Sequence, residues 1–251
     1  MSTPRTQALT KAFELLRAVA ARPGVTASEL ARATGLPRST ATRTLRTLAD
    51  AGIVEERDGW VPGYELVRLA RTADPYRGLV ERARPCVAAL RDEAGESALF
   101  AVFSGRPALE IVLQLDPQRH LGVASWIGVD VPLHASAAGK LALAELSPEE
   151  LDAWLDERSL QSFTPATLAT APALRAELAA VRRRGWADLV DELEDGLTSL
   201  AAGVRDPTGA LTAAIGISGP TSRLGRARRR ELLGPLLQAA GELAAAFRPP
   251  S

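Results

Sequence analysis

The chain has 251 residues, of which 46% are hydrophobic, and carries 30 basic and 30 acidic side chains. This length suffices for a sizeable buried core and for two domains. A single cysteine, Cys86, excludes an internal disulfide and a thiolate cluster for zinc, and the two histidines lack metal-ligand spacing, so we expect no metal and no cofactor. No apolar run approaches the roughly 20 residues that cross a bilayer, and no export signal is evident, so we expect a cytoplasmic protein without membrane contact.

The N-terminal third of the chain begins with helical signals. Residues Gln7 to Ala21 place apolar side chains at helical spacing, which predicts a supporting helix. Thr26 and Glu29 have the spacing of a capping box, so a second helix should start near Ser28. Gly35 should end that helix, because glycine adopts the left-handed conformation that follows a helix.

A third helix is predicted from Arg38 to Asp50. Ala41, Leu45 and Leu48 form one apolar stripe at the 3.6-residue period and should face the core. The opposite face carries hydroxyls and guanidinium groups and no carboxylate before Asp50. Such a face suits base edges and phosphates.

After Gly52, the pattern changes to two short strand-like runs around the turn Asp58-Gly59, which is typical of a wing. Arg57 lies at its tip, whereas Glu55 and Glu56 must point away from phosphate. The whole stretch therefore predicts a winged helix-turn-helix that binds duplex DNA. The residues expected to contact DNA are Thr26, Ser28, Arg38, Ser39, Thr40, Thr42, Arg43, Arg46, Thr47 and Arg57.

The distribution of charge and helical signals indicates two domains. Residues 1–75 carry 11 Lys and Arg against 8 Asp and Glu, a net charge of +3, and the remaining residues carry a net charge of −3. The boundary signal is the turn-forming run 72–75, before a long helix expected over 76–94. We therefore predict a winged helix-turn-helix domain at 1–65, a linker helix at 66–75 and a second domain at 76–251.

The second domain is predicted to be a mixed domain with an antiparallel sheet. Its expected strands are 97–103, 107–115, 120–126, 198–205 and 210–218. Its expected further helices are 135–145, 148–158, 172–184 and 226–247, the last kinked at Gly234-Pro235 or starting there. The fold class is thus α+β with two domains.

Four sequence blocks resemble the IclR family of bacterial transcription regulators. They are Gly35 to Thr40, Pro132 to Lys140, Arg184-Gly185-Trp186 with Gly196-Leu197, and Ile217 to Arg223. The resemblance implies a GAF-like antiparallel sheet with flanking helices in the second domain, which binds a small effector, often an organic acid. It also implies dimers or tetramers on partly palindromic operators, acting as repressor or activator, with repression the favoured mode.

The block Ser136 to Gly139 stands at a predicted helix start, where unpaired amides favour an anion. The resemblance places the effector between this helix start and the sheet, within a wall formed by Val123, Val131, Ala137, Ala138, Leu197, Ser199, Gly216 and Ser218. Ser199, Gly216 and Leu189 replace the cysteine, serine and acidic residue that acid-binding relatives often have. We therefore expect a less polar and larger cavity than one built for a two-carbon acid.

Two other functions are considered. A hydrolase would use His134 and Ser136 with Asp130, but these side chains do not converge from adjacent positions, and no Gly-x-Ser-x-Gly elbow is present. We therefore expect no catalytic residues. A protein-interaction adaptor would use the winged helix to bind protein instead of DNA. Outside these functions, we expect Lys140 to be a surface charge and His134 to be a hydrogen-bonded core residue.

Overall fold

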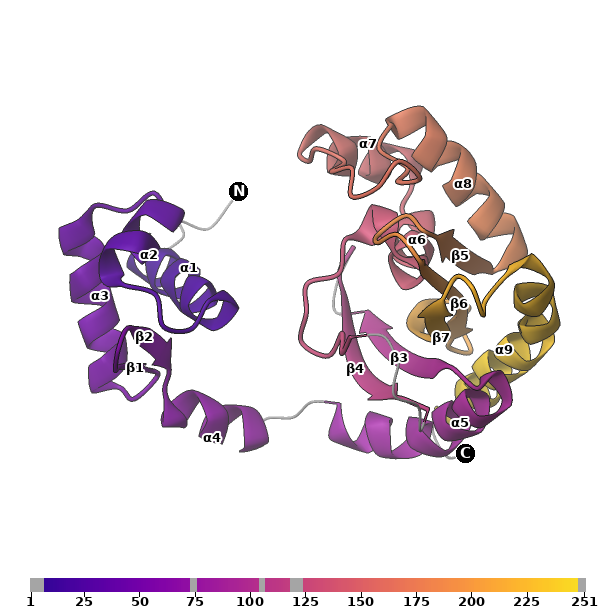
Figure 1. The fold of residues 1–251 in the computed structure, drawn as a ribbon, viewed down its shortest axis with the longest axis horizontal. Helices are drawn as coiled ribbons and strands as arrows, with labels where there is room; N and C mark the ends of the chain where they lie inside the picture. The colour runs from indigo at the N-terminus through magenta and orange to yellow at the C-terminus, as the bar shows by residue number, and fades with distance from the viewer. Residues whose placement is uncertain (1–6, 73–75, 104–106, 118–123, 248–251) are drawn as a thin grey trace. The chain divides into compact units, whose positions relative to one another are not determined.

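The computed structural model describes residues 7–72, 76–103, 107–117 and 124–247. The chain divides after Pro75 into two compact units, each with its own core (Figure 1). The linker helix begins at Tyr64, earlier than the sequence suggested, and runs to Thr72 as α4. None of the described helices is long and apolar enough to cross a membrane.

The first unit is a three-helix bundle with a two-stranded wing. Its elements are α1 (Gln7–Ala21), α2 (Ala27–Ala33), α3 (Arg38–Asp50), β1 (Val54–Glu56), β2 (Trp60–Pro62) and α4 (Tyr64–Thr72). The predicted capping box is confirmed, because the Thr26 hydroxyl accepts from the Glu29 amide and the Glu29 carboxylate accepts from the Thr26 amide. Gly35 has a φ of +66°, the left-handed conformation expected after α2.

The core of the first unit fixes the orientation of α3. Ala41 and Leu45 are fully buried against Leu15 of α1 and Leu30 of α2, as the apolar stripe predicted. Trp60 of the wing completes this core, and its amide donates to the Val25 carbonyl. The opposite face of α3 is consequently left at the surface.

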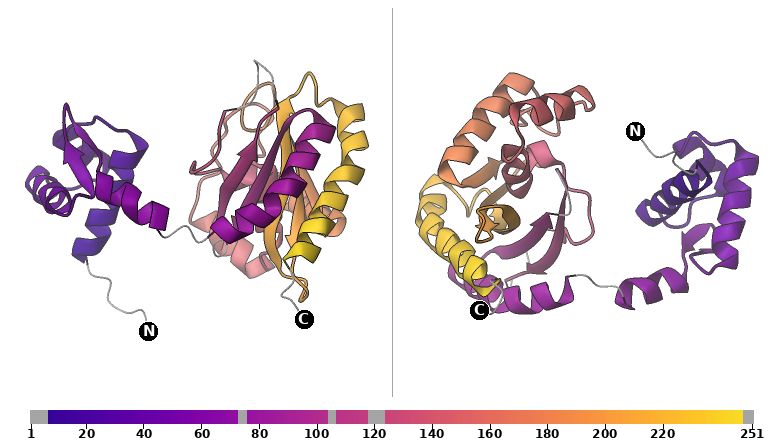
Figure 2. Two further views of the ribbon diagram at one scale, coloured as in Figure 1. Left: turned by 90° about the horizontal axis from the view of Figure 1, so that it is seen from below. Right: turned by 180° about the vertical axis from the view of Figure 1, so that it is seen from behind.

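The second unit is built on one antiparallel sheet of strand order β4-β3-β7-β6-β5. The strands are β3 (Ser97–Phe103), β4 (Leu109–Leu115), β5 (Trp186–Val190), β6 (Leu197–Arg205) and β7 (Leu211–Pro220). The helices are α5 (Arg77–Ala94), α6 (Ala137–Ala144) after the 3-10 turn η1 (Leu133–Ala135), α7 (Pro148–Asp156), α8 (Ala171–Arg184) and α9 (Arg226–Ala246). Helices cover both faces of this sheet (Figures 1 and 2).

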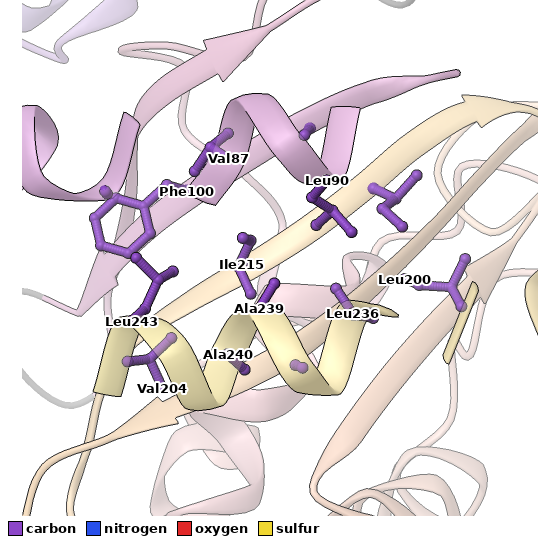
Figure 3. Packing of buried hydrophobic residues seen from close by; sticks show 14 of the residues in the cluster. Val87, Leu90, Phe100, Leu200, Val204, Ile215, Leu236, Ala239, Ala240 and Leu243 are labelled. Carbon is purple, nitrogen blue, oxygen red and sulfur yellow. The ribbon is translucent and has the colours of Figure 1, made fainter. Parts of the chain in front are cut away.

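One face of the sheet is closed by α5 and α9, which lie side by side over it (Figure 2). Alternate residues of the central strands, among them Phe100, Leu200 and Ile215, pack there against Val87 of α5 and Leu243 of α9 (Figure 3). Each such fully buried side chain contributes about 1.5–3 kcal/mol through the area it removes from water. This face is therefore a filled core.

The opposite face meets α6 and α8 through small residues. Ala187, Ala201 and Ala214 of the sheet pack in one cluster with Leu141 of α6 and Leu178 of α8. A separate group of sheet residues, Leu99, Ala101 and Ile111, lies beyond that cluster. The second face is thus only partly filled by helices.

One predicted strand needs correction, and one strand was not predicted. The run 120–126 was expected to be a strand, but its described part, 124–126, has no strand structure, and 120–123 lie outside the described residues. The sequence analysis missed β5, although the buried residues of this strand alternate. The predicted last helix, 226–247, is confirmed as α9, which continues through Pro235 and does not start there. Leu232 and Leu236 are buried on either side of Pro235, so packing outweighs the cost of about 3 kcal/mol for an interior proline.

The start of α6 depends on a glycine that touches η1. A Cβ atom on Gly139 would lie 2.4 Å from both the Cα and the carbonyl oxygen of Leu133. In contrast, a Cβ atom on Gly241 in α9 would have no neighbour within 4 Å outside its own helix.

We predict that Gly139→Ala destabilises the second unit by about 1–3 kcal/mol through overpacking against backbone. The matched variant Gly241→Ala should stabilise it by about 0.5–1 kcal/mol, because alanine loses less entropy in a helix. Urea unfolding followed by circular dichroism measures both. A Gly139→Ala protein as stable as the parent would contradict this close packing.

Candidate functional sites

The exposed face of α3 is the first candidate site. A shallow groove along this helix is lined by Arg38, Ser39, Thr42, Arg43, Arg46, Thr47 and Asp50. Arg43 and Arg46 are exposed, and neither forms an ion pair within the described residues. Their guanidinium groups can therefore reach acceptors on another molecule.

Three of the other residues expected to contact DNA are less available. Thr40 is half-buried and does not line the groove. The Thr26 hydroxyl is used in the capping box, where it also donates to the Glu29 carboxylate at 2.6 Å. Ser28 is half-buried in the first turn of α2. Of these three, Thr26 has a structural role at the start of α2.

The wing carries an ion pair that was not predicted from the sequence. The Arg57 guanidinium lies 2.9 Å from the Glu55 carboxylate, and both side chains are exposed. The hydrogen bond from Arg57 is the main reason that the pKa of Glu55 is lowered. Glu55 therefore offsets part of the positive charge of Arg57 at the wing tip.

The second candidate site is a cavity against the sheet face that the helices leave partly open. The space within and around it, including open solvent at its mouth, is about 540 Å³. It lies between the first turn of α6, strands β3, β4, β6 and β7, and the loop between β5 and β6. Its wall comprises Leu99, Ala101, Leu109, Ile111, Trp126, Val131, Ser136, Ala137, Ala138, Leu189, Leu193, Leu197, Ser199, Ala201, Ala214, Ile215, Gly216 and Ser218.

This wall brings together the residues that the resemblance implied. Val131, Ala137, Ala138, Leu197, Ser199, Gly216 and Ser218 all line the cavity, whereas Val123 lies outside the described residues. Ser199 and Ser218 are directly paired between β6 and β7. Gly216 is tightly placed, since a Cβ atom there would lie 2.8 Å from the Leu200 carbonyl oxygen.

The polar groups of the cavity are few and come from the start of α6 and from β6 and β7. Ser136 caps α6, because its hydroxyl accepts from the Gly139 amide at 3.2 Å. The amides of Ala137 and Ala138 belong to the first turn, which has no acceptor within the helix. The hydroxyls of Ser199 and Ser218 form no protein hydrogen bond among the described residues. No charged side chain lines this wall. The cavity can thus hold a carboxylate by neutral donors and an apolar body by its walls.

Sequence reasoning missed the part of the wall formed by β3 and β4. Leu99 and Ala101 alternate with residues that face α5 and α9, so the period of two contained the signal. Trp126 had no such signal, because it lies in a loop. Its amide donates to the side chain of Gln114 on β4 at 3.0 Å, a contact between residues distant in sequence.

Lys140 corrects another expectation. It was expected at the surface, but only 1% of it is exposed. Its Nζ donates to Glu192 Oε1 at 2.6 Å and to the Asp188 carbonyl at 2.9 Å. The surrounding helices α6 and α8 and the sheet bury this position, which its local sequence pattern could not show.

His134 and Ser136 are used in structural contacts. His134 is buried, and its Nε2 lies 2.9 Å from the Gln161 carbonyl oxygen. Ser136 serves as the cap of α6, and among the described residues it does not pair with His134. The arrangement does not provide an activated nucleophile.

A winged helix-turn-helix joined to a sheet unit with an apolar cavity defines a DNA-binding transcriptional regulator, a class that is not enzymatic. Family comparison agrees with this class. The model of the IclR helix-turn-helix domain matches residues 8–58, and the model of the bacterial transcriptional regulator IclR C-terminal matches residues 76–245. The chain belongs to the IclR family.

Similar proteins cover nearly the whole chain. The transcriptional repressor IclR of Escherichia coli is 34% identical over 98% of this chain and 92% of its own length. The regulator BhcR of Paracoccus denitrificans is 33% identical over 97% of this chain and 88% of its own length.

Solved structures show the same arrangement of elements. An IclR homolog of Microbacterium hydrocarbonoxydans, complexed with 4-hydroxybenzoate, has a TM-score of 0.77 and 25% identity, covering 96% of this chain and 99% of that one. The IclR of Thermotoga maritima has a TM-score of 0.67 and 25% identity, covering 96% and 98%.

Proposed function

We propose that this protein is a repressor that binds operator DNA through α3 and the wing, and that a small organic acid in the cavity of the second unit modulates this binding. The observation that carries the proposal is the pairing of two sites in one chain. One is a helix face with unpaired guanidinium groups, and the other is an apolar cavity that ends at the first turn of α6. Relatives named as repressors support the direction of regulation.

The DNA site favours binding as a dimer on a palindromic operator. Residues 1–75 carry a net charge of only +3, so one unit offers few phosphate contacts. Two units double these contacts and read two half-sites. Within each unit, the exposed Arg43 and Arg46 of the α3 groove contact base edges, and Arg57 of the wing contacts backbone phosphate.

The ligand site favours an acid with one carboxylate and an apolar body. The amides of Ala137 and Ala138, together with the Ser218 hydroxyl, offer donors for one anionic group. The rest of the wall is apolar, and Leu189 brings no charge to it. The neighbouring structure that holds 4-hydroxybenzoate shows that this fold accommodates an aromatic acid.

Regulation requires that the ligand prefer one state of the protein. A preference of about 100-fold between the DNA-binding and the released states corresponds to about 2.7 kcal/mol of coupling. The helix α4 connects the winged unit to the chain that leads into the second unit, so it is the element through which this preference would act.

Arg43→Ala should weaken operator binding by about 1–3 kcal/mol and relax specificity at one position of each half-site, because a bidentate contact to guanine is lost. Gel-shift titrations against a set of operators with single base changes measure both effects. Replacing Arg43 and Arg46 together should abolish the DNA shift. A double variant that still shifts DNA as the parent does would favour the protein-interaction adaptor instead.

Arg57→Ala tests the proposed contact with backbone phosphate and is compared with Arg43→Ala, which tests the contact with base edges. It should weaken binding to all sequences equally and by less than Arg43→Ala, because Glu55 already offsets part of its charge. The same titrations apply. If both single variants relax specificity equally, the assignment of base and phosphate contacts is incorrect.

The proposed dimer or tetramer should exist without DNA, since homo-oligomers with isologous contacts are the common case for such regulators. Sedimentation velocity at micromolar protein should therefore show species heavier than the 26.5 kDa chain. Only the monomer under these conditions would contradict the proposed assembly.

Ala138→Leu should remove the response to ligand without changing operator binding in its absence, because the larger side chain fills the space beside the α6 amides. The measurement is the operator affinity with and without 4-hydroxybenzoate or another aromatic acid. The control Ala142→Leu is in the same helix but outside the cavity wall. An unchanged ligand response in Ala138→Leu would place the ligand elsewhere.

A further inference from the structure

A buried ion pair joins two walls of the cavity. Helix α6 contributes Ala137 and Ala138 to the wall and carries Lys140 in its next turn. The loop between β5 and β6 contributes Leu193 to the wall and carries Glu192 beside it. The 2.6 Å contact between Lys140 Nζ and Glu192 Oε1 therefore connects the α6 side of the cavity to the loop side.

This pair is incompletely satisfied. Glu192 Oε2 is buried and has no hydrogen-bond partner among the described residues. The loop backbone is nevertheless anchored, because the Thr164 hydroxyl donates to the Asp191 carbonyl and the Thr167 hydroxyl to the Glu192 carbonyl, both at 2.6 Å. Glu192 thus holds a charge in a fixed buried position where one oxygen lacks compensation, which is energetically costly.

The charges around Glu192 come from four elements. Lys140 on α6 is the cation in contact, while Glu177 on α8 and Asp188 on β5 are nearby carboxylates. Arg184 on α8 pairs with both of these carboxylates, and Arg229 on α9 lies 3.6 Å from Asp188. Burial is the main cause that raises the pKa of Glu192, with contributions from Glu177 and Asp188, whereas Lys140 opposes the rise. A further negative charge nearby would favour the protonated form.

We propose that Lys140 and Glu192 are positioning residues of the ligand cavity, and that Glu192 takes up one proton from solvent when an anion binds at the first turn of α6. This inference rests on the proposed ligand site. The bound anion would lie on the order of 10 Å from Glu192, given the helix rise of about 1.5 Å per residue and the length of the lysine side chain. A proton on Oε2 leaves the Lys140 contact to Oε1 in place and leaves the Lys140 charge uncompensated, so that it attracts the anion.

The test is the pH dependence of benzoate binding to the full-length protein. Benzoate stays ionised between about pH 5.5 and 8, because an ordinary carboxyl group has a pKa of about 4. Its Kd should fall as the pH falls, by at most about tenfold per pH unit for one linked proton. Calorimetry in two buffers of different ionisation enthalpy should show proton uptake on binding.

Two variants separate this role from a purely structural one. Glu192→Gln keeps the size and one acceptor oxygen but cannot take up the proton, so its benzoate Kd should not depend on pH. Glu194→Gln makes the same change at an exposed position of the same loop and should retain the parent's pH dependence. The double variant Lys140→Met with Glu192→Met should fold, since apolar side chains of similar size can replace a buried pair, and should also bind without pH dependence.

The outcomes distinguish this inference from the proposed function. Benzoate binding that is independent of pH in the parent would overturn the proton uptake and leave the ligand site standing. A pH dependence that survives in Glu192→Gln would also overturn it, because another group would then be responsible. If the parent fails to bind benzoate at any pH, the proposed ligand chemistry and this inference both fail.

Discussion

The second unit depends on the burial of both faces of its five-stranded sheet. On one face, α5 and α9 fill the space with large side chains such as Phe100 and Leu243. On the other face, α6 and α8 meet small residues such as Ala201 and Ala214, and Ala138 at the start of α6 packs against the cluster that contains Leu99 and Ile111. The cavity is the unfilled remainder of that face. Its shape is therefore set by how the sheet is covered, and its lining is apolar for the same reason that the core is apolar.

The helix α6 links packing to recognition. It is buried along almost its whole length, and its first-turn residues Ala137 and Ala138 line the cavity. Donors in such surroundings interact more strongly with an anion than they would at a surface, because the local dielectric is low. The same burial makes Gly139 necessary for contact with η1 and places Lys140 where it needs Glu192. Small residues at the helix start thus serve close packing and leave space beside the first-turn amides.

The winged unit follows a different principle. Its small core fixes α3 through Ala41 and Leu45, and the polar face then points outward without further constraint. The DNA-binding surface of the winged unit carries few charged side chains, so the position of each charge matters more than the net charge. The ion pair between Arg57 and Glu55 is one example, since it reduces the attraction of the wing tip for phosphate without changing the fold.

The sequence by itself determined the features that depend on contacts between residues close together in the chain. The capping box at Thr26 and the bounds of α3 follow from neighbouring residues. The resemblance to the IclR family added the residues of the cavity wall, which the spacing of residues in the sequence could not have identified. Only the tertiary structure decided that Lys140 is buried, that α9 continues through Pro235, and that Trp126 and Leu193 close the cavity. Each of these depends on contacts between segments far apart in the chain, and the free energy of such packing exceeds the local preferences that a sequence pattern records.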